Sequence, residues 1–311
     1  MRNATPCLLL LAVTLLTPQA TAAEPKETGK TRPYVLVILA DDLGYSDLGC
    51  YGGEIRTPNL DRLAKDGLRF TQFYNCARCW PTRASLLTGY YPQQVRRDTV
   101  PGVPSGGKGV RPPWARLLPE MLRPLGYRSY HSGKWHIDGQ PTSNGFDHSY
   151  LLQDQGRYFN PRVHSEDGRP LPAVKPGSGY YATTAIADHA IKCLKEHAEK
   201  YADKPFFHYL AFTSPHFPLQ APAEDIARYR DVYGKGWEVV RAARVKRIKD
   251  LELVAGRASE PERDVGPPYD YPDALKKLGP GEVNRPLLWD RLTAEQTVEL
   301  LEAPLQRPII F

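Results

Sequence analysis

The first strong pattern along the chain is a continuous run of apolar residues, Tyr34 to Ala40, followed at once by Asp41 and Asp42. An unbroken apolar run of this length is typical of a strand that is buried on both faces of a parallel sheet. Two adjacent carboxylates would then stand at the carboxyl end of the strand, where open α/β sheets bind their ligands. We therefore expect a buried strand at 34–40 with polar chemistry at its end.

Amphipathic helices and apolar strands alternate along the following part of the chain. The pattern predicts helices from Thr57-Pro58 to Gly67, from Leu117 to Leu125 and from Thr183 to Tyr201, and strands from Leu68 to Tyr74, from Tyr127 to His131 and from Phe206 to Phe212. The recurring order of strand, polar residues and helix predicts an α/β domain of three layers, with a mostly parallel central sheet. We expect its polar residues to gather at one edge of that sheet.

The N-terminus has the features of an export signal. Arg2 precedes an apolar stretch from Cys7 to Leu16, and Ala20-Thr21-Ala22 provides a small-residue cleavage site. We expect residues 1–22 to be removed as a signal peptide, because the apolar stretch is too short to span a bilayer. Residues 23–32 are expected to form a flexible lead-in. No other apolar segment is long enough to span a bilayer, so we expect a periplasmic or secreted protein without a membrane anchor.

The net charge says little about the partners of the protein. The formal net charge of +6 is modest for 311 residues and suits a polyanionic substrate, although most such charge is solvated surface. The densest basic stretch, Arg241 to Lys249, follows Trp237 in a helical pattern. No recognised nucleic-acid-binding module accompanies it, so we expect no nucleic-acid partner.

The most informative segment is Cys79-Trp80-Pro81-Thr82-Arg83, which continues to Leu86-Leu87-Thr88-Gly89. Pro81 suits the first position of a helix and Gly89 the residue just past its end, which places Cys79 at a helix N-terminus. The unpaired N–H groups there favour an anion. Arg83, one turn later, adds a permanent positive charge that can hydrogen-bond to it.

Other interpretations of the cysteines exist. After signal removal four remain, Cys50, Cys76, Cys79 and Cys193, which is too few for a disulfide scaffold. Cys76 and Cys79 could form a CxxC pair for redox exchange or zinc, or Cys79 could be a buried structural residue. Zinc sites usually need a second pair of ligands, and redox pairs need their own fold. The proline, arginine and Leu-Leu-Thr-Gly that follow favour a functional cysteine.

Two further segments place cationic and titratable side chains after strands. Lys134 and His136, in Gly133-Lys134-Trp135-His136, can face the same side if the backbone is extended there. His216 follows an apolar strand in Ser214-Pro215-His216. Taken alone, Lys134 and His136 are more simply exposed loop residues. The remaining histidines are most simply surface or packing residues: His131, His148, His164, His189, His197 and His208.

Together these segments resemble the sulfatase family, within the alkaline-phosphatase-like superfamily. Cys79 to Arg83 resembles the signature Cys-x-Pro-x-Arg, and Gly133 to His136 is similar to the second sulfatase signature. Asp41-Asp42 and Ser214-Pro215-His216 also match, and the four segments stand in the family's order. The likeness covers residues 33–296, which we take as the catalytic domain, and extends to the arylsulfatase branch.

The resemblance implies a sulfuric ester hydrolase that acts on a sulfated small molecule or glycan. A modifying enzyme would oxidise Cys79 to formylglycine, whose hydrate attacks a sulfate ester with one hydroxyl and uses the second to expel sulfate. Lys134 and His136 would contact the formylglycine and the sulfate, near Arg83. His216 would bind sulfate and help to protonate the leaving alcohol.

A divalent metal is also expected. Adjacent carboxylates at a strand end repel each other unless a cation lies beside them. Asp41, Asp42 and one oxygen of the formylglycine at Cys79 are expected to bind the metal. We expect Ca²⁺ rather than Mg²⁺, because calcium tolerates irregular oxygen geometry whereas magnesium requires a strict octahedron.

The chain departs from the family after His216. Family members are longer and supply a later Asp-Asn pair that completes the metal site, but no strand ending in Asp-Asn follows here, and residues 297–311 show no family likeness. We therefore expect a catalytic domain that is incomplete on its C-terminal side. Two alternatives remain: an inactive truncated remnant that lacks the later metal ligands, and a phosphonate or phosphodiester hydrolase of the same superfamily.

Overall fold

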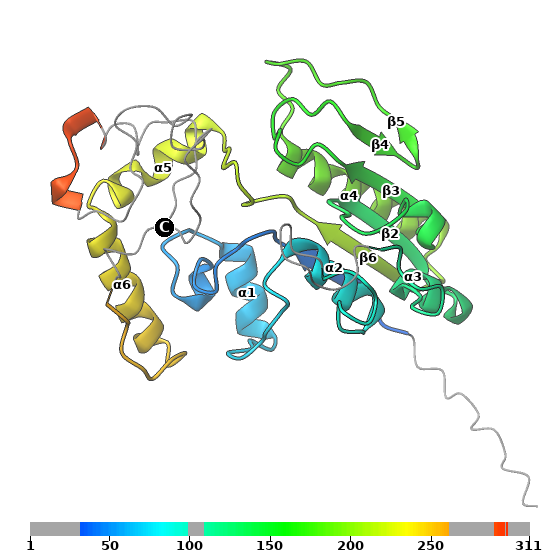
Figure 1. The fold of residues 1–311 in the computed structure, drawn as a ribbon, viewed down its shortest axis with the longest axis horizontal. Coiled ribbons are helices and arrows are strands. Elements are labelled where there is room, and N and C mark those ends of the chain that lie inside the picture. Colours follow the sequence, from blue (N-terminus) through cyan, green and yellow to red (C-terminus); the bar gives the residue numbers. More distant parts are fainter. Residues whose placement is uncertain (1–31, 99–108, 261–288, 296, 298–311) are drawn as a thin grey trace, which may run out of the picture. The chain divides into compact units, whose positions relative to one another are not determined.

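The computed structural model describes residues 32–98, 109–260, 289–295 and 297. Apart from Arg32, these belong to one compact unit, Pro33–Phe311. The described residues form a six-stranded sheet with the order β1-β6-β2-β3-β4-β5 (Figure 1). The strands are β1 (Val35–Leu39), β2 (Arg128–Gly133), β3 (His148–Leu152), β4 (His164–Glu166), β5 (Arg169–Pro170) and β6 (Phe206–Ala211). β1, β6, β2 and β3 are parallel and β4 and β5 are antiparallel, so the predicted mostly parallel sheet is confirmed.

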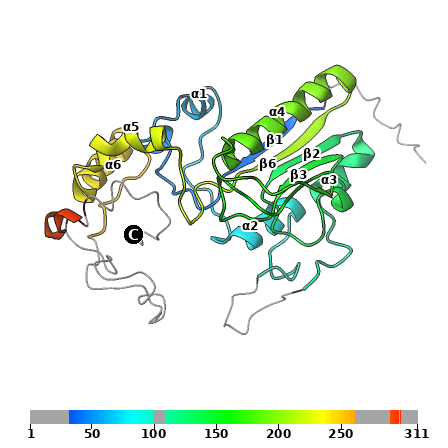
Figure 2. The same ribbon diagram turned by 90° about the horizontal axis from the view of Figure 1, so that it is seen from above.

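Helices cover both faces of the sheet (Figure 2). α4 (Ala182–Lys200) packs on one face through Ile186 and Ala190. α2 (Cys79–Thr88) and α3 (Leu118–Leu122) pack on the other, where Leu87 joins the core. The other helices are α1 (Pro58–Asp66), α5 (Ala223–Tyr233), α6 (Trp237–Asp250) and short 3₁₀ helices at Gly49–Tyr51, Arg123–Leu125, Thr142–Asn144 and Trp289–Arg291. Helices on both sides of one sheet confirm the predicted three-layer α/β domain.

β1 differs from the expected strand in its burial. Val35, Val37 and Leu39 pack against the core on the α2 face. Leu36 and Ile38, on the opposite face, remain 44% and 47% exposed. Among the described residues β1 pairs only with β6 and forms the edge of the sheet. The expectation of burial on both faces is therefore wrong for this part of the chain, because an apolar run does not distinguish a central strand from an edge strand.

Helix ends follow the sequence signals closely. α1 ends before Gly67, and α2 ends before Gly89, whose φ of 76° is left-handed. α2 begins at Cys79 itself, two residues earlier than the proline rule predicts, so Pro81 is its third residue. The N-terminal placement of Cys79 is confirmed.

The strand expected from Leu68 to Tyr74 does not form. Leu68 is 78% exposed and Tyr74 is 84% exposed. The carbonyl oxygens of Phe70 and Thr71 accept hydrogen bonds from tyrosine hydroxyls instead of from a neighbouring strand. The apolar residues of this segment therefore have no sheet face to cover, and the prediction is wrong.

α5 and α6 form ion pairs and hydrogen bonds with the segment that follows β1. Arg244 of α6 donates from Nε to Glu54 at 2.9 Å and from Nη1 to Asp47 at 2.8 Å, and Tyr233 of α5 donates to Glu54 at 2.7 Å. Part of the basic stretch at 241–249 therefore has a structural role. None of the helices in the described ranges is long and apolar enough to cross a membrane. The predicted signal peptide lies outside the described residues.

Candidate active site

Backbone hydrogen bonds join the ends of β1 and β6. The Phe212 N–H donates to the Leu39 carbonyl at 2.9 Å, and the Asp41 N–H donates to the Ser214 carbonyl at 3.0 Å. This link brings Asp41-Asp42 next to the Ser214-Pro215-His216 segment. Asp42 Oδ2 and His216 Nε2 are 3.7 Å apart. Two of the four predicted segments therefore meet at one edge of the sheet.

Asp41 lies in a buried ion-pair cluster with Arg83 and Lys134. Arg83 Nη2 is 3.3 Å from Asp41 Oδ1, and the Lys134 ammonium contacts the other carboxylate oxygen. The three residues are 4%, 1% and 0% exposed. One carboxylate thus faces two buried cations, which leaves a net positive charge. Because a buried uncompensated charge is unfavourable, this ion-pair cluster is suited to take up an anion.

Close backbone packing positions both cations. Gly133, at the end of β2, has a φ of 113°, and a Cβ there would overlap the Ala211 carbonyl oxygen, so glycine alone fits. The Lys134 N–H donates to the same carbonyl at 2.8 Å. Arg83 Nη1 donates to the Lys134 carbonyl and to the Tyr209 hydroxyl, each at 3.0 Å. β2 and β6 therefore hold Lys134 and Arg83 against each other.

Cys79 is the first residue of α2 and carries a free, half-buried thiol. Cys79 and Arg83 are four residues apart and therefore share one face of the helix. Since Arg83 contacts Asp41 from that face, the first turn of α2 faces the ion-pair cluster. Cys76 is also free, and its sulfur lies 3.5 Å from Ser85 Oγ.

His136 lies next to this cluster in an unusual backbone conformation. Its φ is 57°, so the backbone from Lys134 to His136 is not extended. Burial, together with the positive charges of Lys134, Arg83 and Arg97, lowers the pKa of His136 to about 4. The imidazole is therefore neutral at neutral pH. Its Nδ1 atom is buried and has no hydrogen-bond partner among the described residues.

Several residues at the site were not selected from the sequence. The Tyr158 hydroxyl lies 2.8 Å from the carbonyl oxygens of Thr213 and His216 and so fixes the loop after β6. Tyr209 orients Arg83, as described above. Arg97 donates to the His136 carbonyl at 3.4 Å. No local signal marks these residues, because each acts through a partner far away in the sequence.

The described residues do not form a complete metal site. Within the described ranges, no group of three or more His, Cys, Asp or Glu side chains is placed to hold a metal ion. The Asp41 carboxylate is paired with two cations, and Asp42 faces His216. The donor set present, two consecutive carboxylates, falls short of the six to eight oxygens of calcium. The predicted Ca²⁺ ligands Asp41, Asp42 and Cys79 therefore stay a prediction.

Three other buried histidines make contacts within the core, and one of them, His131, lies 3.5 Å from the Lys134 carbonyl oxygen. His131 bonds to Ser149 Oγ at 2.9 Å, and His189 and His208 bond to Ser132 Oγ at 2.8 and 3.0 Å. Burial lowers the pKa of His131 and His208 to about 3 and that of His189 to about 4. These rings are therefore neutral, in agreement with the packing role expected for them.

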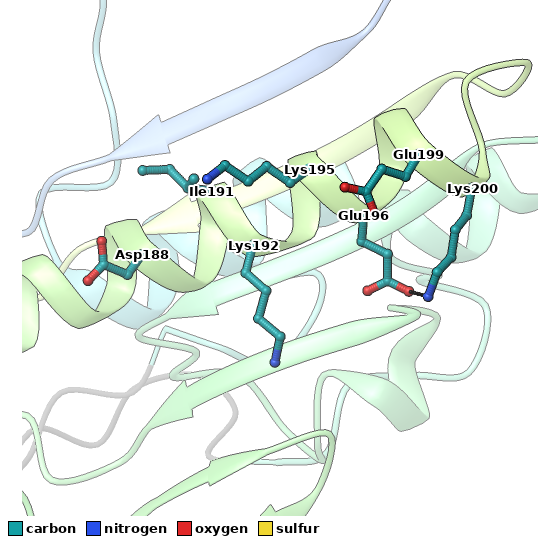
Figure 3. Close-up of a pocket in the computed structure, with 7 residues that line it drawn as sticks. All are labelled: Asp188, Ile191, Lys192, Lys195, Glu196, Glu199 and Lys200. Carbon is teal, nitrogen blue, oxygen red and sulfur yellow. Dashed lines mark hydrogen bonds and ion pairs between the residues drawn. The ribbon is translucent and has the colours of Figure 1, made fainter.

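A hollow of about 470 Å³ lies elsewhere, on the outer face of α4 (Figure 3). Its lining includes the charged residues Asp188, Lys192, Lys195, Glu196, Glu199 and Lys200. Lys200 pairs with Glu196 at 3.1 Å, and Lys192 pairs with Glu166. The hollow contains none of the predicted site residues, and its charges compensate one another. It is a solvated helix face.

Sequence comparisons agree with this arrangement. A profile of the Sulfatase family matches residues 33–275. The chain is 35% identical over 302 residues to an uncharacterized sulfatase of Schizosaccharomyces pombe, covering 87% of this chain and 50% of that protein. It is 34% identical over 244 residues to the arylsulfatase of Klebsiella aerogenes, covering 72% of this chain and 51% of that protein. The chain thus spans about half the length of these curated relatives.

The chain is also similar in fold to solved structures. Ps i-CgsB in complex with k-i-k-neocarrahexaose matches with a TM-score of 0.56 and 28% identity, covering 72% of this chain and 53% of that one. BT4656 in complex with its substrate D-glucosamine-2-N,6-O-disulfate matches with a TM-score of 0.52 and 30% identity, covering 65% and 38%. The expected alkaline-phosphatase-like α/β fold is confirmed.

Proposed function

Since the chain belongs to the sulfatase family, we propose that it carries the nucleophile and the sulfate-binding side chains of a sulfuric ester hydrolase. The observation that carries this proposal is the buried cluster in which one carboxylate, Asp41, faces both Arg83 and Lys134. One of its two cations, Arg83, lies one turn after Cys79 in α2. The N–H groups of a guanidinium and an ammonium match the oxygens of a sulfate group.

We assign the nucleophile to position 79. The first residue of a helix lies at the positive end of the helix dipole, where negative charge on an attacking atom is stabilised. After conversion to formylglycine by a modifying enzyme, position 79 would supply a hydrated aldehyde oxygen that attacks sulfur. Arg83, on the same face of α2, and Lys134 would hold the sulfate oxygens for that attack.

His136 and His216 are assigned to sulfate contact and proton transfer. The His136 ring, whose pKa is lowered to about 4, is neutral at neutral pH. One of its nitrogens can donate a hydrogen bond to the sulfate or the nucleophile, and the other can accept one. His216 would protonate the leaving alcohol, while Asp42, 3.7 Å away, orients its ring.

Asp41 and Asp42 are proposed to contribute oxygens to a Ca²⁺ site. The described residues do not complete such a site, so water or residues outside the described ranges would supply the other ligands. When bound, the ion would add positive charge near the nucleophile. No step above depends on it.

A second candidate function is that of an inactive sulfatase-like remnant. The lack of a third metal ligand among the described residues favours it. Calcium titration separates the two candidates. A ligand that binds only the folded state stabilises it, by about 2.7 kcal/mol at a hundredfold excess over Kd, and therefore raises the melting temperature. No rise at millimolar calcium would favour the remnant.

We propose a sulfated glycan or sulfated small molecule as the substrate. The solved relatives named above were obtained with k-i-k-neocarrahexaose and with a disulfated glucosamine, which supports a sulfated sugar. Export to the periplasm or the medium is proposed from the predicted signal peptide alone.

The test of the catalytic proposal is co-expression with a formylglycine-generating enzyme, followed by mass analysis of the peptide that contains Cys79 and by assays on aryl sulfate and aryl phosphodiester substrates. We expect conversion at Cys79 and turnover of the sulfate ester. Cys76→Ser is the matched control and should leave conversion intact, whereas Cys79→Ala should abolish turnover. An unconverted thiol, or a preference for the phosphodiester, would contradict the proposal.

A further inference from the structure

A second group of basic and aromatic side chains lies beside Cys79. The Trp80 ring, next in α2, is 5.4 Å from the His136 ring, centroid to centroid. The guanidinium carbon of Arg97 is 5.4 Å from the centroid of the Trp80 ring. We refer to Trp80, Arg97 and His136 as the Arg97 cluster. Its members come from three separate segments of the chain, and the fold alone brings them together.

The Arg97 cluster contains polar nitrogens that are not used within the described residues. Trp80 Nε1, His136 Nδ1 and Arg97 Nε are buried and have no hydrogen-bond partner in the part of the chain that the structure describes. The other two nitrogens of Arg97 make long contacts of 3.4 Å each, to the carbonyls of Gly109 and His136. Buried donors without acceptors are unfavourable, so the arrangement favours a ligand that brings acceptor oxygens.

The charged groups around His136 also favour the binding of an anion. Lys134, Arg83 and Arg97 each lower the pKa of His136 through their positive charge, while Asp41 acts in the opposite direction. The electrostatic potential at the His136 ring is therefore positive. Since Arg97 on the one hand and Arg83 and Lys134 on the other all act on this one ring, an anion bound at Arg97 would lie in the neighbourhood of a sulfate bound at Arg83 and Lys134.

We propose that the Arg97 cluster is a second anion-binding position, next to the one that binds the scissile sulfate. The inference rests on the proposed function, which defines the first position. The substrate class is then a sulfate ester whose sugar ring carries another acidic group close to the ester. A sulfate and a carboxylate share the required chemistry, because a guanidinium binds either one through two parallel N–H···O bonds.

Binding to the chain with an unconverted Cys79 tests this inference without relying on turnover. Isothermal titration would compare inorganic sulfate, N-acetylglucosamine 6-sulfate, glucosamine 2-N,6-O-disulfate and a monosulfated glucuronic acid. We expect the two sugars with a second acidic group to bind about tenfold more tightly than the monosulfated neutral sugar, as a charge-assisted pair provides. If only the disulfate or only the uronate binds more tightly, the result identifies which acidic group the Arg97 cluster prefers.

Arg97→Gln should reduce that preference to about onefold and leave binding of the monosulfated neutral sugar within about twofold. Arg96→Gln is the matched control, because Arg96 is the neighbouring arginine and is exposed. It should change neither affinity. Trp80→Phe keeps the ring and removes the Nε1 donor, and should lower affinity for the doubly acidic sugars alone. Melting temperatures of all variants report whether each one folds.

Three results would overturn the inference. If both classes of sugar bind equally to the unaltered chain, or if Arg97→Gln weakens both by the same factor, Arg97 has only a structural role and the proposed sulfatase function is unaffected. If no sulfate compound binds, the sulfate-binding part of the proposed function fails together with the inference. Should Arg97→Gln unfold the chain, Arg97→Lys replaces it. Lysine keeps the charge but lacks the planar fork, so an intermediate preference is expected.

Discussion

Replacing Asp41 by Asn would remove the carboxylate that compensates two buried cations. Asparagine keeps the size of the side chain, so the change acts mainly on charge. In the unaltered chain Asp41 lies 3.3 Å from Arg83 and also contacts Lys134, and all three side chains are almost inaccessible to water. In Asp41→Asn the cluster would hold two positive charges and no negative one. We expect the folded state to lose stability.

The magnitude follows from the burial of the pair. Removing one partner of a buried ion pair typically costs about 3–5 kcal/mol, because the remaining charge is left uncompensated. For a domain of this size, that loss corresponds to a fall of about 6–20 °C in melting temperature. It is also a large share of the roughly 5–15 kcal/mol by which domains are stable. Inorganic sulfate should restore part of the loss, because an anion would replace the missing carboxylate.

Urea unfolding followed by circular dichroism, with and without sulfate, would measure both effects. Asp42→Asn is the matched control, since Asp42 is the adjacent carboxylate and its side chain is 57% exposed. For such an exposed group we expect a change of about 0–1 kcal/mol. An Asp41→Asn protein as stable as the unaltered chain would refute the account of the cluster. A stabilisation by sulfate that is larger in the unaltered chain than in the variant would also refute it.

Three further predictions concern the fold. Burial lowers the pKa of His136 and His189 to about 4 and that of His131 and His208 to about 3, from 6.5. The unfolded chain therefore binds more protons between those values and 6.5, and stability should fall as the pH drops below about 6.5. Equal urea midpoints at about pH 7 and about pH 5 would contradict this. Gly133→Ala should destabilise the chain more than Gly89→Ala, because a Cβ at 133 overlaps the Ala211 carbonyl oxygen whereas one at 89 meets nothing within 4 Å; thermal melts of both variants decide it. Arg244→Met should cost about 1–3 kcal/mol by leaving the buried Glu54 carboxylate without its main partner, and the double variant with Glu54→Gln should recover part of that loss.

Much of the site's framework could be predicted from the sequence because local signals set it. Gly89 ends α2 in a left-handed conformation that glycine adopts most easily. The apolar runs ending near Asp41 and Ser214 become neighbouring strands whose ends carry polar residues. These features depend on residues close together in the chain, so a single sequence contains the information.

Other features depended on contacts that no local pattern records. The pairing of Asp41 with both Arg83 and Lys134 requires β1, α2 and β2 to meet, which no local pattern indicates. Tyr209 supports Arg83 from across the core. The segment from Leu68 to Tyr74 has the composition of a strand but no neighbouring strand to pair with, and composition alone cannot supply one.

The edge position of β1 has a practical consequence for handling the protein. Edge strands present unpaired backbone N–H and C=O groups to solvent, and among the described residues Leu36 and Ile38 of β1 lie exposed beside that edge. Chains with such an edge tend to add to one another strand by strand, so recombinant material should enter inclusion bodies readily and remain dispersed only in dilute solution. A lysine in place of Ile38 would act as a gatekeeper and should raise the soluble yield.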